Sequence, residues 1–178
     1  SRFKKLLFTK FKNKLKLFMN PNNTINTFRI VLSVGDESGI GPEIILKALF
    51  SKEIPKNIDL TIVGSKKHLL NTYRHLKSLG LENIENPKNL KIHDLEISPY
   101  ENKSKSSYGN SSFYYLTKAI EIVKQYPNSA LVTGPICKKS WSLAGHYFSG
   151  QTEVLAKSCG VKNVGMLFTA KSPITGWR

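Results

Sequence analysis

The stretch FRIVLSVGDESGIGPEIILKALF, residues 28–50, constrains the fold of this chain more than any other part of it. Its apolar beginning is typical of a buried strand, and an apolar-periodic helix follows from Pro42. Proline suits the first turn of a helix because its missing N–H would have no partner there, and Glu43 suits the positive end of the helix dipole. The stretch therefore predicts a strand, a tight turn and a helix in immediate succession.

Three glycines lie in this turn, Gly35, Gly39 and Gly41. Glycines between a strand and a helix let backbone N–H groups approach an anion closely, so a cofactor or substrate loop is one interpretation. A plain tight turn is the other, and the residues alone leave both open. The spacing does not match the dinucleotide-binding pattern, and no Gly-Lys-Ser/Thr follows as in a P-loop.

The rest of the chain alternates between strand and helix patterns. Apolar runs predict strands at 58–63, 130–132 and 164–169 and a weaker one at 90–97, while residues 98–107 are polar and suggest a loop. Helices are expected at 66–79, 111–126 and 152–158, with another beginning near Lys138 or Lys139. Ser65 can cap the first of these, and Gly80 and Gly160 can end helices. Such alternation favours a three-layer α/β fold with a mainly parallel sheet.

Two segments of the chain resemble the 4-hydroxythreonine-4-phosphate dehydrogenase family of pyridoxal phosphate (vitamin B6) biosynthesis. GDESGIGPEIILKAL, from Gly35, is similar to its N-terminal signature. ALVTGPICKKSWSLAGHYFSGQTEVLAKSCGVKNVGMLF, from Ala130, is similar to its second block, where a Thr-Gly-Pro turn leads to a Gly-His-Thr-Glu step and a strand. The chain departs from the family pattern at Glu37 and Ser38, where Pro and Ala are usual, and at Gln151, where His is usual.

The resemblance implies an αβα fold of the isocitrate/isopropylmalate-dehydrogenase-like type. It runs from about Phe28 to the last residue and covers about the first half of the family's chain, so we expect this chain to be truncated. Residues 28–178 are then the N-terminal part of the dehydrogenase fold. Residues 1–27 are expected to form a basic and polar N-terminal extension.

The extension contributes much of the formal net charge of +15, because the first 18 residues hold seven basic side chains and no acid. Three interpretations compete: a membrane-surface or transit segment, a disordered extension, or non-native upstream sequence. We favour the last two, with Met19 as a plausible true start. No apolar run approaches the ~18–20 residues of a spanning helix, and no signal-peptide h-region is present. We therefore expect a cytoplasmic protein without a membrane partner.

The remaining charge is diffuse and accompanies no recognised nucleic-acid motif, so we expect no nucleic-acid partner. A basic body suits small anionic substrates. Cys137 and Cys159 show neither metal-type spacing nor a disulfide framework and are expected to be reduced thiols.

The activity implied by the resemblance is NAD-dependent oxidation of 4-phosphooxy-L-threonine, with decarboxylation to 3-amino-2-oxopropyl phosphate. The resemblance also implies a divalent metal (Zn, Mg or Co) and a homodimer with sites at the subunit interface. It places the metal ligands beyond Arg178, so no metal ligand is expected in this chain and we expect the chain alone to be inactive. Two alternatives remain: a paralogue that oxidises a phospho-threonate or phospho-erythronate, and an inert fragment that only binds phosphorylated ligands.

The resemblance also implies candidate site residues. Lys138 could meet a phosphate, Thr152 matches a substrate-binding threonine, and Gln151 replaces a substrate-contacting histidine with an amide that cannot titrate. Thr152 or Ser149 could equally serve as a helix N-cap. The loop for cofactor or substrate comprises Gly35, Asp36, Gly39 and Gly41.

Asp36 could orient a ligand or simply cap its own turn. Glu37 beside it receives no role, because it does not match the family pattern. The four histidines are expected to be structural or solvated, and His146 is the best candidate for another role among His68, His75, His93 and His146.

Overall fold

The computed structural model describes residues 28–51, 55, 57–97 and 104–168. The expected extension 1–27, with its start candidate Met19, lies outside the described residues. The same holds for most of the predicted loop at 98–107.

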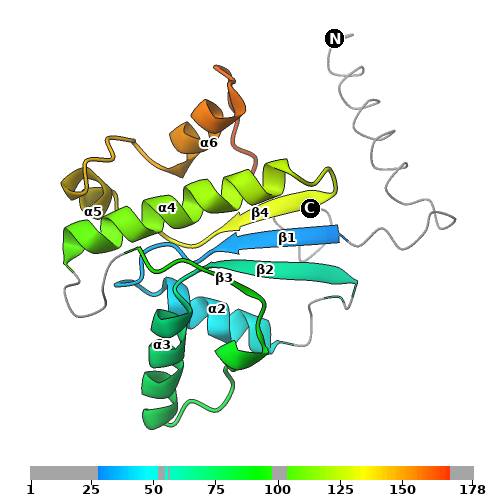
Figure 1. Cartoon of the computed structure of the whole chain (residues 1–178), viewed down its shortest axis with the longest axis vertical. Helices are drawn as coiled ribbons and strands as arrows, with labels where there is room; N and C mark the ends of the chain where they lie inside the picture. The colour runs from blue at the N-terminus through cyan, green and yellow to red at the C-terminus, as the bar shows by residue number, and fades with distance from the viewer. Residues whose placement is uncertain (1–27, 52–54, 56, 98–103, 169–178) are drawn as a thin grey trace, which may run out of the picture.

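Four parallel strands form the central sheet, in the order β3-β2-β1-β4 (Figure 1). All the strand pairings of this sheet are parallel, which confirms the expected α/β class. The strands are β1 (Phe28–Ser33), β2 (Ile58–Gly64), β3 (Ile92–Asp94) and β4 (Ser129–Thr133).

Helices cover both faces of this sheet and complete the three layers (Figure 1). Helices α2 (Gly41–Phe50) and α3 (Lys66–Ser78) lie on one face. Helix α4 (Lys105–Lys124) crosses the other face, with α5 (Lys138–Leu143) and α6 (Gln151–Cys159) beyond it. A short 3-10 turn, η1 (Pro87–Asn89), precedes β3. Among the described helices, none has both the length and the apolar character needed to cross a bilayer.

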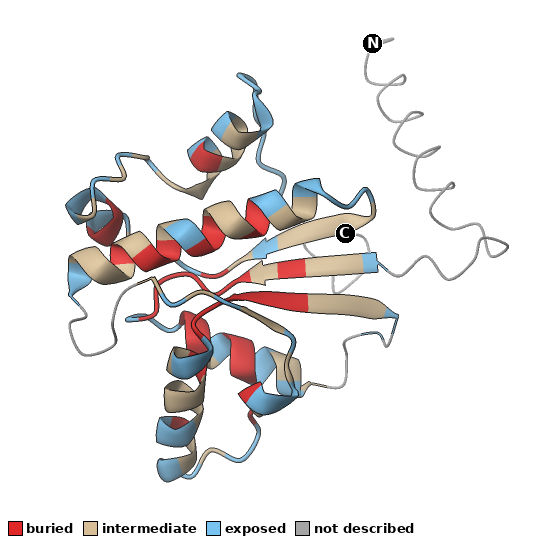
Figure 2. Ribbon diagram, in the orientation of Figure 1, coloured by how far each residue is buried: buried red, intermediate tan, exposed pale blue. Residues whose placement is uncertain are grey.

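The main core lies between the central strands and the helices on both faces. Val31 and Val63 are fully buried in β1 and β2, and Ala119 of α4 packs onto them. Figure 2 shows that buried residues recur at intervals along α4. Burying apolar surface on both faces of a parallel sheet is the main stabilising term of such folds.

A second core joins α4 to α5 and α6 around Trp141. Its indole is fully buried and donates a hydrogen bond to Ser112 Oγ at 2.7 Å, so its polar N–H is satisfied. The two helices approach so closely that any side chain at Gly109 would overlap the carbonyl group of Ser140. Glycine at position 109 therefore permits the α4–α5 contact.

Most predicted elements are present, and their local signals work as expected. Ser65 caps α3 by accepting a hydrogen bond from the amide of His68 at 3.1 Å. Gly160 ends α6 in the left-handed conformation, with φ of 65°. Helix α4 begins earlier than the apolar pattern predicts, because Ser104 and Ser107 form a capping box before the first apolar residue.

Two strand predictions need correction. The weak strand expected at 90–97 shortens to Ile92–Asp94, after the 3-10 turn that begins at Pro87. The strand expected at 164–169 is absent from its described part, 164–168, where Met166 and Phe168 are 69% and 84% exposed. An apolar run becomes a strand only when a neighbouring strand takes up its backbone hydrogen bonds, and no described residue does so here.

The turns that follow β1 and β4 are hydrogen-bonded to each other. The amide of Gly134 donates to the carbonyl of Ser33, and the amide of Asp36 donates to the carbonyl of Pro135, both at 2.8 Å. These bonds continue the β1–β4 pairing past the last ladder residues and join segments that are far apart in the sequence.

Glycine is required at both sides of this junction. Gly35 has φ of +79°, and a side chain there would overlap the carbonyl of Pro135. A side chain at Gly134 would overlap the backbone of Val34. The two turns interlock because each lacks a side chain where the other passes.

Replacing Gly134 with alanine should lower the free energy of unfolding by more than about 2 kcal/mol, because overlapping backbone atoms must separate. Urea unfolding followed by circular dichroism measures the loss. Gly39→Ala is the matched control, since a Cβ there meets nothing closer than the carbonyl oxygen of Asp36 at 3.5 Å. Equal unfolding midpoints for the two variants would contradict the interlock.

Candidate functional site

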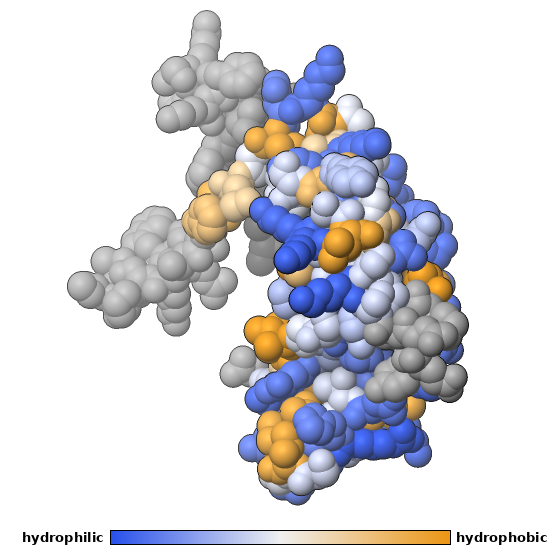
Figure 3. Space-filling model, turned by 90° about the vertical axis from the view of Figure 1, so that its left-hand side faces the viewer, coloured by the Kyte–Doolittle hydropathy of each residue, from blue (hydrophilic) through white to orange (hydrophobic). Residues whose placement is uncertain are grey.

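The strand order places a topological switch point between β1 and β4. From β1 the chain runs outward to β2 and β3, and α4 then returns it to β4 on the other side of β1. Ligands of open α/β sheets bind at such a point, outside the carboxyl ends of the strands. Figure 3 views the edge where the strands end, and hydrophilic side chains predominate there among separate apolar ones.

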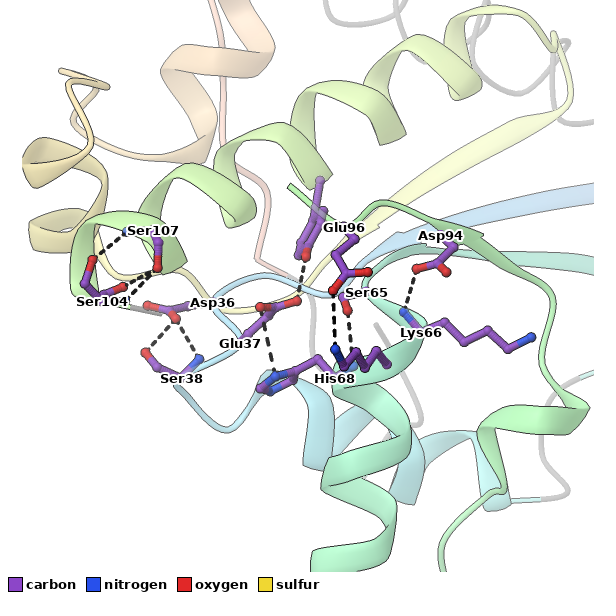
Figure 4. Close-up of polar contacts among 12 residues, drawn as sticks. Asp36, Glu37, Ser38, Ser65, Lys66, His68, Asp94, Glu96, Ser104 and Ser107 are labelled. Carbon is purple, nitrogen blue, oxygen red and sulfur yellow. Dashed lines mark hydrogen bonds and ion pairs between the residues drawn. The ribbon is translucent and has the colours of Figure 1, made fainter. Parts of the chain in front are cut away.

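Asp36 follows β1 closely, and the residue is only 5% exposed. Its Oδ1 accepts hydrogen bonds from the amide of Ser38 at 2.9 Å and from the Ser38 hydroxyl at 2.7 Å (Figure 4). These are the bonds of a turn that caps itself, the second of the two roles considered for Asp36. Ligand orientation by Asp36 stays a prediction.

Packing accounts for two of the three glycines in the predicted binding loop. Gly35 is required by the interlock with Pro135, and a side chain at Gly41 would approach the carbonyl oxygen of Val34 to 2.5 Å. Gly39 is exposed, and a side chain there would make only an ordinary contact, 3.5 Å from the carbonyl oxygen of Asp36. The close turn is thus one function of these glycines, and anion binding at the loop stays a prediction.

Gln151 lies at the start of α6 and holds the turn after β4. Its Oε1 accepts a hydrogen bond from the Thr133 hydroxyl at 2.7 Å, and its Nε2 donates to the carbonyl of Gly134 at 2.8 Å. Both ends of the amide are therefore engaged, in a residue that is half-buried. Gln151 therefore lies beside the Thr-Gly-Pro turn, through hydrogen bonds that the sequence did not indicate.

Lys138 and the start of α6 come together beside this turn. A methyl group at Gly150 would lie 3.6 Å from Cε and 3.9 Å from Nζ of Lys138, whose side chain is exposed, and 3.5 Å from Oε2 of Glu153. Gly150 is the N-cap of α6 and provides no side-chain cap, so the alternative that Thr152 or Ser149 caps this helix is wrong. Thr152 lies half-buried in the first helical turn. A lysine ammonium beside free helix N–H groups is suited to an anion.

Glu37 is the polar residue at this edge that sequence reasoning missed. Its side chain is fully buried, and its Oε1 accepts a hydrogen bond from the Tyr115 hydroxyl at 2.5 Å. Its Oε2 lies 4.0 Å from Nδ1 of His68 (Figure 4). Burial and the negative charge of Glu37 raise the pKa of Tyr115, so the phenol remains a donor. The two adjacent carboxylates, Asp36 and Glu37, at the end of a strand were the signal in the sequence for such a residue. The sequence could not show that the side chain of Glu37 points into the core.

Among the other titratable residues, His146 has a structural role. Its ring stacks on Phe113 with centroids 3.8 Å apart, and its Nε2 lies 2.9 Å from Oδ1 of Asn110. Burial lowers the pKa of His146 and favours the neutral ring. A hydrogen bond with the side chain of Ser140 lowers the pKa of the Cys137 thiol. Cys137 and Cys159 are both free thiols.

The described residues contain no group of three or more His, Cys, Asp or Glu side chains placed to hold a metal ion. They therefore do not by themselves fit the divalent metal that the family resemblance implies. We derive no chemical step at a metal from this part of the chain.

An apolar hollow of about 210 Å³ adjoins the site between α2 and β4. Ile44 and Val132 are 43% and 44% exposed at its rim, and Thr133 and Gly134 form its polar end. The candidate site therefore has an apolar wall on one side and the Lys138 ammonium on another.

Comparisons with known proteins agree with this architecture. The family model described as "Pyridoxal phosphate biosynthetic protein PdxA" matches residues 56–175. A 4-hydroxythreonine-4-phosphate dehydrogenase from Nostoc sp. is 42% identical over an alignment of 171 residues, which covers 89% of this chain and 47% of the relative. A Fusobacterium nucleatum protein named "Putative D-threonate 4-phosphate dehydrogenase" is 31% identical, over 83% of this chain and 45% of the relative.

The solved 4-hydroxythreonine-4-phosphate dehydrogenase of Klebsiella pneumoniae has the same fold, with a TM-score of 0.66 at 23% identity. The likeness covers 84% of this chain and 49% of that one. The chain thus spans about half the length of the relatives it matches. On the family model and the curated relatives, this chain belongs to the PdxA family of pyridoxal phosphate biosynthetic proteins.

Proposed function

We propose that this chain provides part of the substrate site of an enzyme that oxidises 4-phosphooxy-L-threonine. NAD accepts the hydride, and the resulting 3-oxo acid loses carbon dioxide to give 3-amino-2-oxopropyl phosphate. The names of the relatives support the dehydrogenase class and the substrate family. The main structural support for the proposal is that Lys138 lies beside the start of α6 near the switch point, and that no side chain caps this helix.

The phosphate of the substrate is the group that this convergence suits. The ammonium of Lys138 supplies a positive charge, and the first N–H groups of α6 point outward with the positive end of the helix dipole. The Thr152 hydroxyl can add a hydrogen bond from the first turn of the helix. Glu153 also lies near Gly150, and its carboxylate repels a bound anion. The attraction of the Lys138 ammonium must therefore exceed this repulsion.

Gln151 gives this site an anchor that does not change with pH. An amide cannot gain or lose a proton, so the bonds to Thr133 and Gly134 persist over the whole physiological range. Beside Gly134, the apolar side chains of the hollow, Ile44 and Val132 among them, provide a wall that cannot hydrogen-bond to water. The turn after β4 is therefore held in one position against the phosphate site.

The other parts of the proposal come from the family resemblance alone. We propose NAD, a divalent metal (Zn, Mg or Co), a homodimer and a cytoplasmic location for the complete enzyme. We further propose that residues 1–178 alone do not turn over substrate.

One observation favours a second candidate substrate. Position 151 departs from the family pattern, and the matched Fusobacterium relative carries the name of a D-threonate 4-phosphate dehydrogenase. A phospho-threonate shares the phosphate but has a hydroxyl in place of the amino group. Offering 4-phosphooxy-L-threonine and a phospho-threonate in direct competition distinguishes the two candidate substrates. If both bind and neither is turned over, the inert fragment that only binds phosphorylated ligands is the remaining alternative.

A chimera that joins residues 1–178 to the remaining half of the Nostoc relative tests the proposal. We expect NADH formation from 4-phosphooxy-L-threonine, measured at 340 nm. Lys138→Met should raise KM about tenfold or more, because a charge-assisted hydrogen bond to phosphate is lost.

Lys139→Met is the matched control for this variant. Lys139 is also exposed in α5, and its replacement should change KM less than about twofold. A folded chimera that forms no NADH would overturn the proposed activity. Equal increases in KM in the two lysine variants would instead show that Lys138 does not contact the phosphate.

Gln151→His in the same chimera should lower KM about tenfold near pH 6, with less gain above pH 8. The imidazole has an unperturbed pKa of about 6.5, so it carries a positive charge toward an anionic substrate only at the lower pH. The variant also loses the amide bonds to Thr133 and Gly134, which should cost about 1 kcal/mol of stability at both pH values. Identical changes in KM at the two pH values would show that position 151 does not touch the substrate.

A further inference from the structure

A buried carboxylate at the switch point is left unexplained by the proposed function. The side chain of Glu37 has no exposed surface, although it belongs to a turn whose next three residues, 38–40, are exposed. Moving a carboxylate out of water costs several kcal/mol unless hydrogen bonds and charge partners compensate. A glutamate is kept in such a place only where its contacts offset that cost.

The contacts of Glu37 come from both helical layers. Tyr115 belongs to α4 on one face of the sheet, and its hydroxyl donates to Oε1 at 2.5 Å. His68 belongs to α3 on the opposite face, and its Nδ1 lies 4.0 Å from Oε2. Figure 4 shows Glu37 reaching from the loop after β1 toward His68, with Asp36 and Ser38 beside it. One carboxylate therefore spans the sheet edge between α3 and α4.

The partners of Glu37 are themselves held in place. Tyr115 is fully buried in the main core, and the backbone of His68 is fixed by the cap that Ser65 provides to α3. The side chain of His68 is only 13% exposed. The carboxylate thus meets a fixed phenol and a histidine whose backbone is fixed, and we infer that the turn takes its position from them.

We propose that Glu37 is a positioning residue, which holds the turn 36–39 in its observed place by connecting it to α4 and α3. It acts through Asp36, whose amide donates to Pro135 at 2.8 Å and whose carbonyl accepts from the Gly39 amide at 3.1 Å. The inference concerns the loop and does not depend on which substrate the site binds. Its test needs no turnover, so it can fail while the proposed activity stands.

Amide hydrogen exchange of the 178-residue chain, followed by NMR, tests this role. In Glu37→Gln, which keeps the shape but removes the charge, the amides of Asp36 and Gly39 should exchange at least about tenfold faster relative to that of Ile62. The Ile62 amide donates to Lys91 at 2.9 Å within the buried sheet and reports global opening. A role in overall stability alone would accelerate all three amides equally.

Tyr115→Phe removes a single hydroxyl and should accelerate the same turn amides by a similar factor. The double variant should show no more acceleration than the larger single one, because both changes break one interaction. Tyr114→Phe and Glu121→Gln are the matched controls in α4: Tyr114 is 46% exposed, and the Glu121 side chain is 60% exposed. Neither control should change the ratio between turn and sheet exchange.

Unchanged ratios in both Glu37→Gln and Tyr115→Phe would overturn the proposal. Additive effects in the double variant would also overturn it, because they would show that the two residues act separately. If Glu37→Gln does not fold, the ratio in Tyr115→Phe decides by itself, since that change leaves the carboxylate and its contact with His68 in place.

Discussion

The interlock between the turns after β1 and β4 is the constraint on which the rest of the site depends. Gly35 and Gly134 let two backbones pass within hydrogen-bonding distance, and the bonds from Asp36 to Pro135 and from Gly134 to Ser33 close the junction. Every other candidate site residue is positioned with reference to this junction. Gln151 fixes its β4 side, and Glu37 fixes its β1 side.

The candidate site is consequently built from the backbone outward. Two sequence blocks that lie far apart in the chain meet because β1 and β4 are neighbours in the sheet. Among the described residues, six elements separate the two strands in sequence: α2, β2, α3, η1, β3 and α4. Lys138 follows shortly after the β4 turn, and the chain returns to it after α5, where Gly150 lies beside Lys138. A rigid backbone junction holds polar side chains around one point, and such an arrangement is suited to binding a small anion.

The sequence predicts the elements well where one local rule decides. Strand β1, the proline-led start of α2, the Ser65 cap and the Gly160 stop all follow from patterns within a few residues. Prediction from the sequence fails where residues distant in the chain determine the structure. At residues 164–168, for example, the apolar run has no neighbouring strand among the described residues. The burial of Glu37 was equally inaccessible, because it depends on Tyr115 and His68 from opposite layers. The hydrogen bonds of Gln151 could not be predicted either, because they depend on where the fold places Gly134.

The close contact of α4 and α5 has a mechanical consequence. Ser140 fits against Gly109 without intervening side chains, and Trp141 fills the space beside them, so the two helices cannot slide past each other. Helix α5 carries Lys138 at its first position, while α4 carries Tyr115 six residues beyond Gly109. The distance between Lys138 and the turn at Asp36 is therefore set by the stretch of α4 that runs from Gly109 to Tyr115.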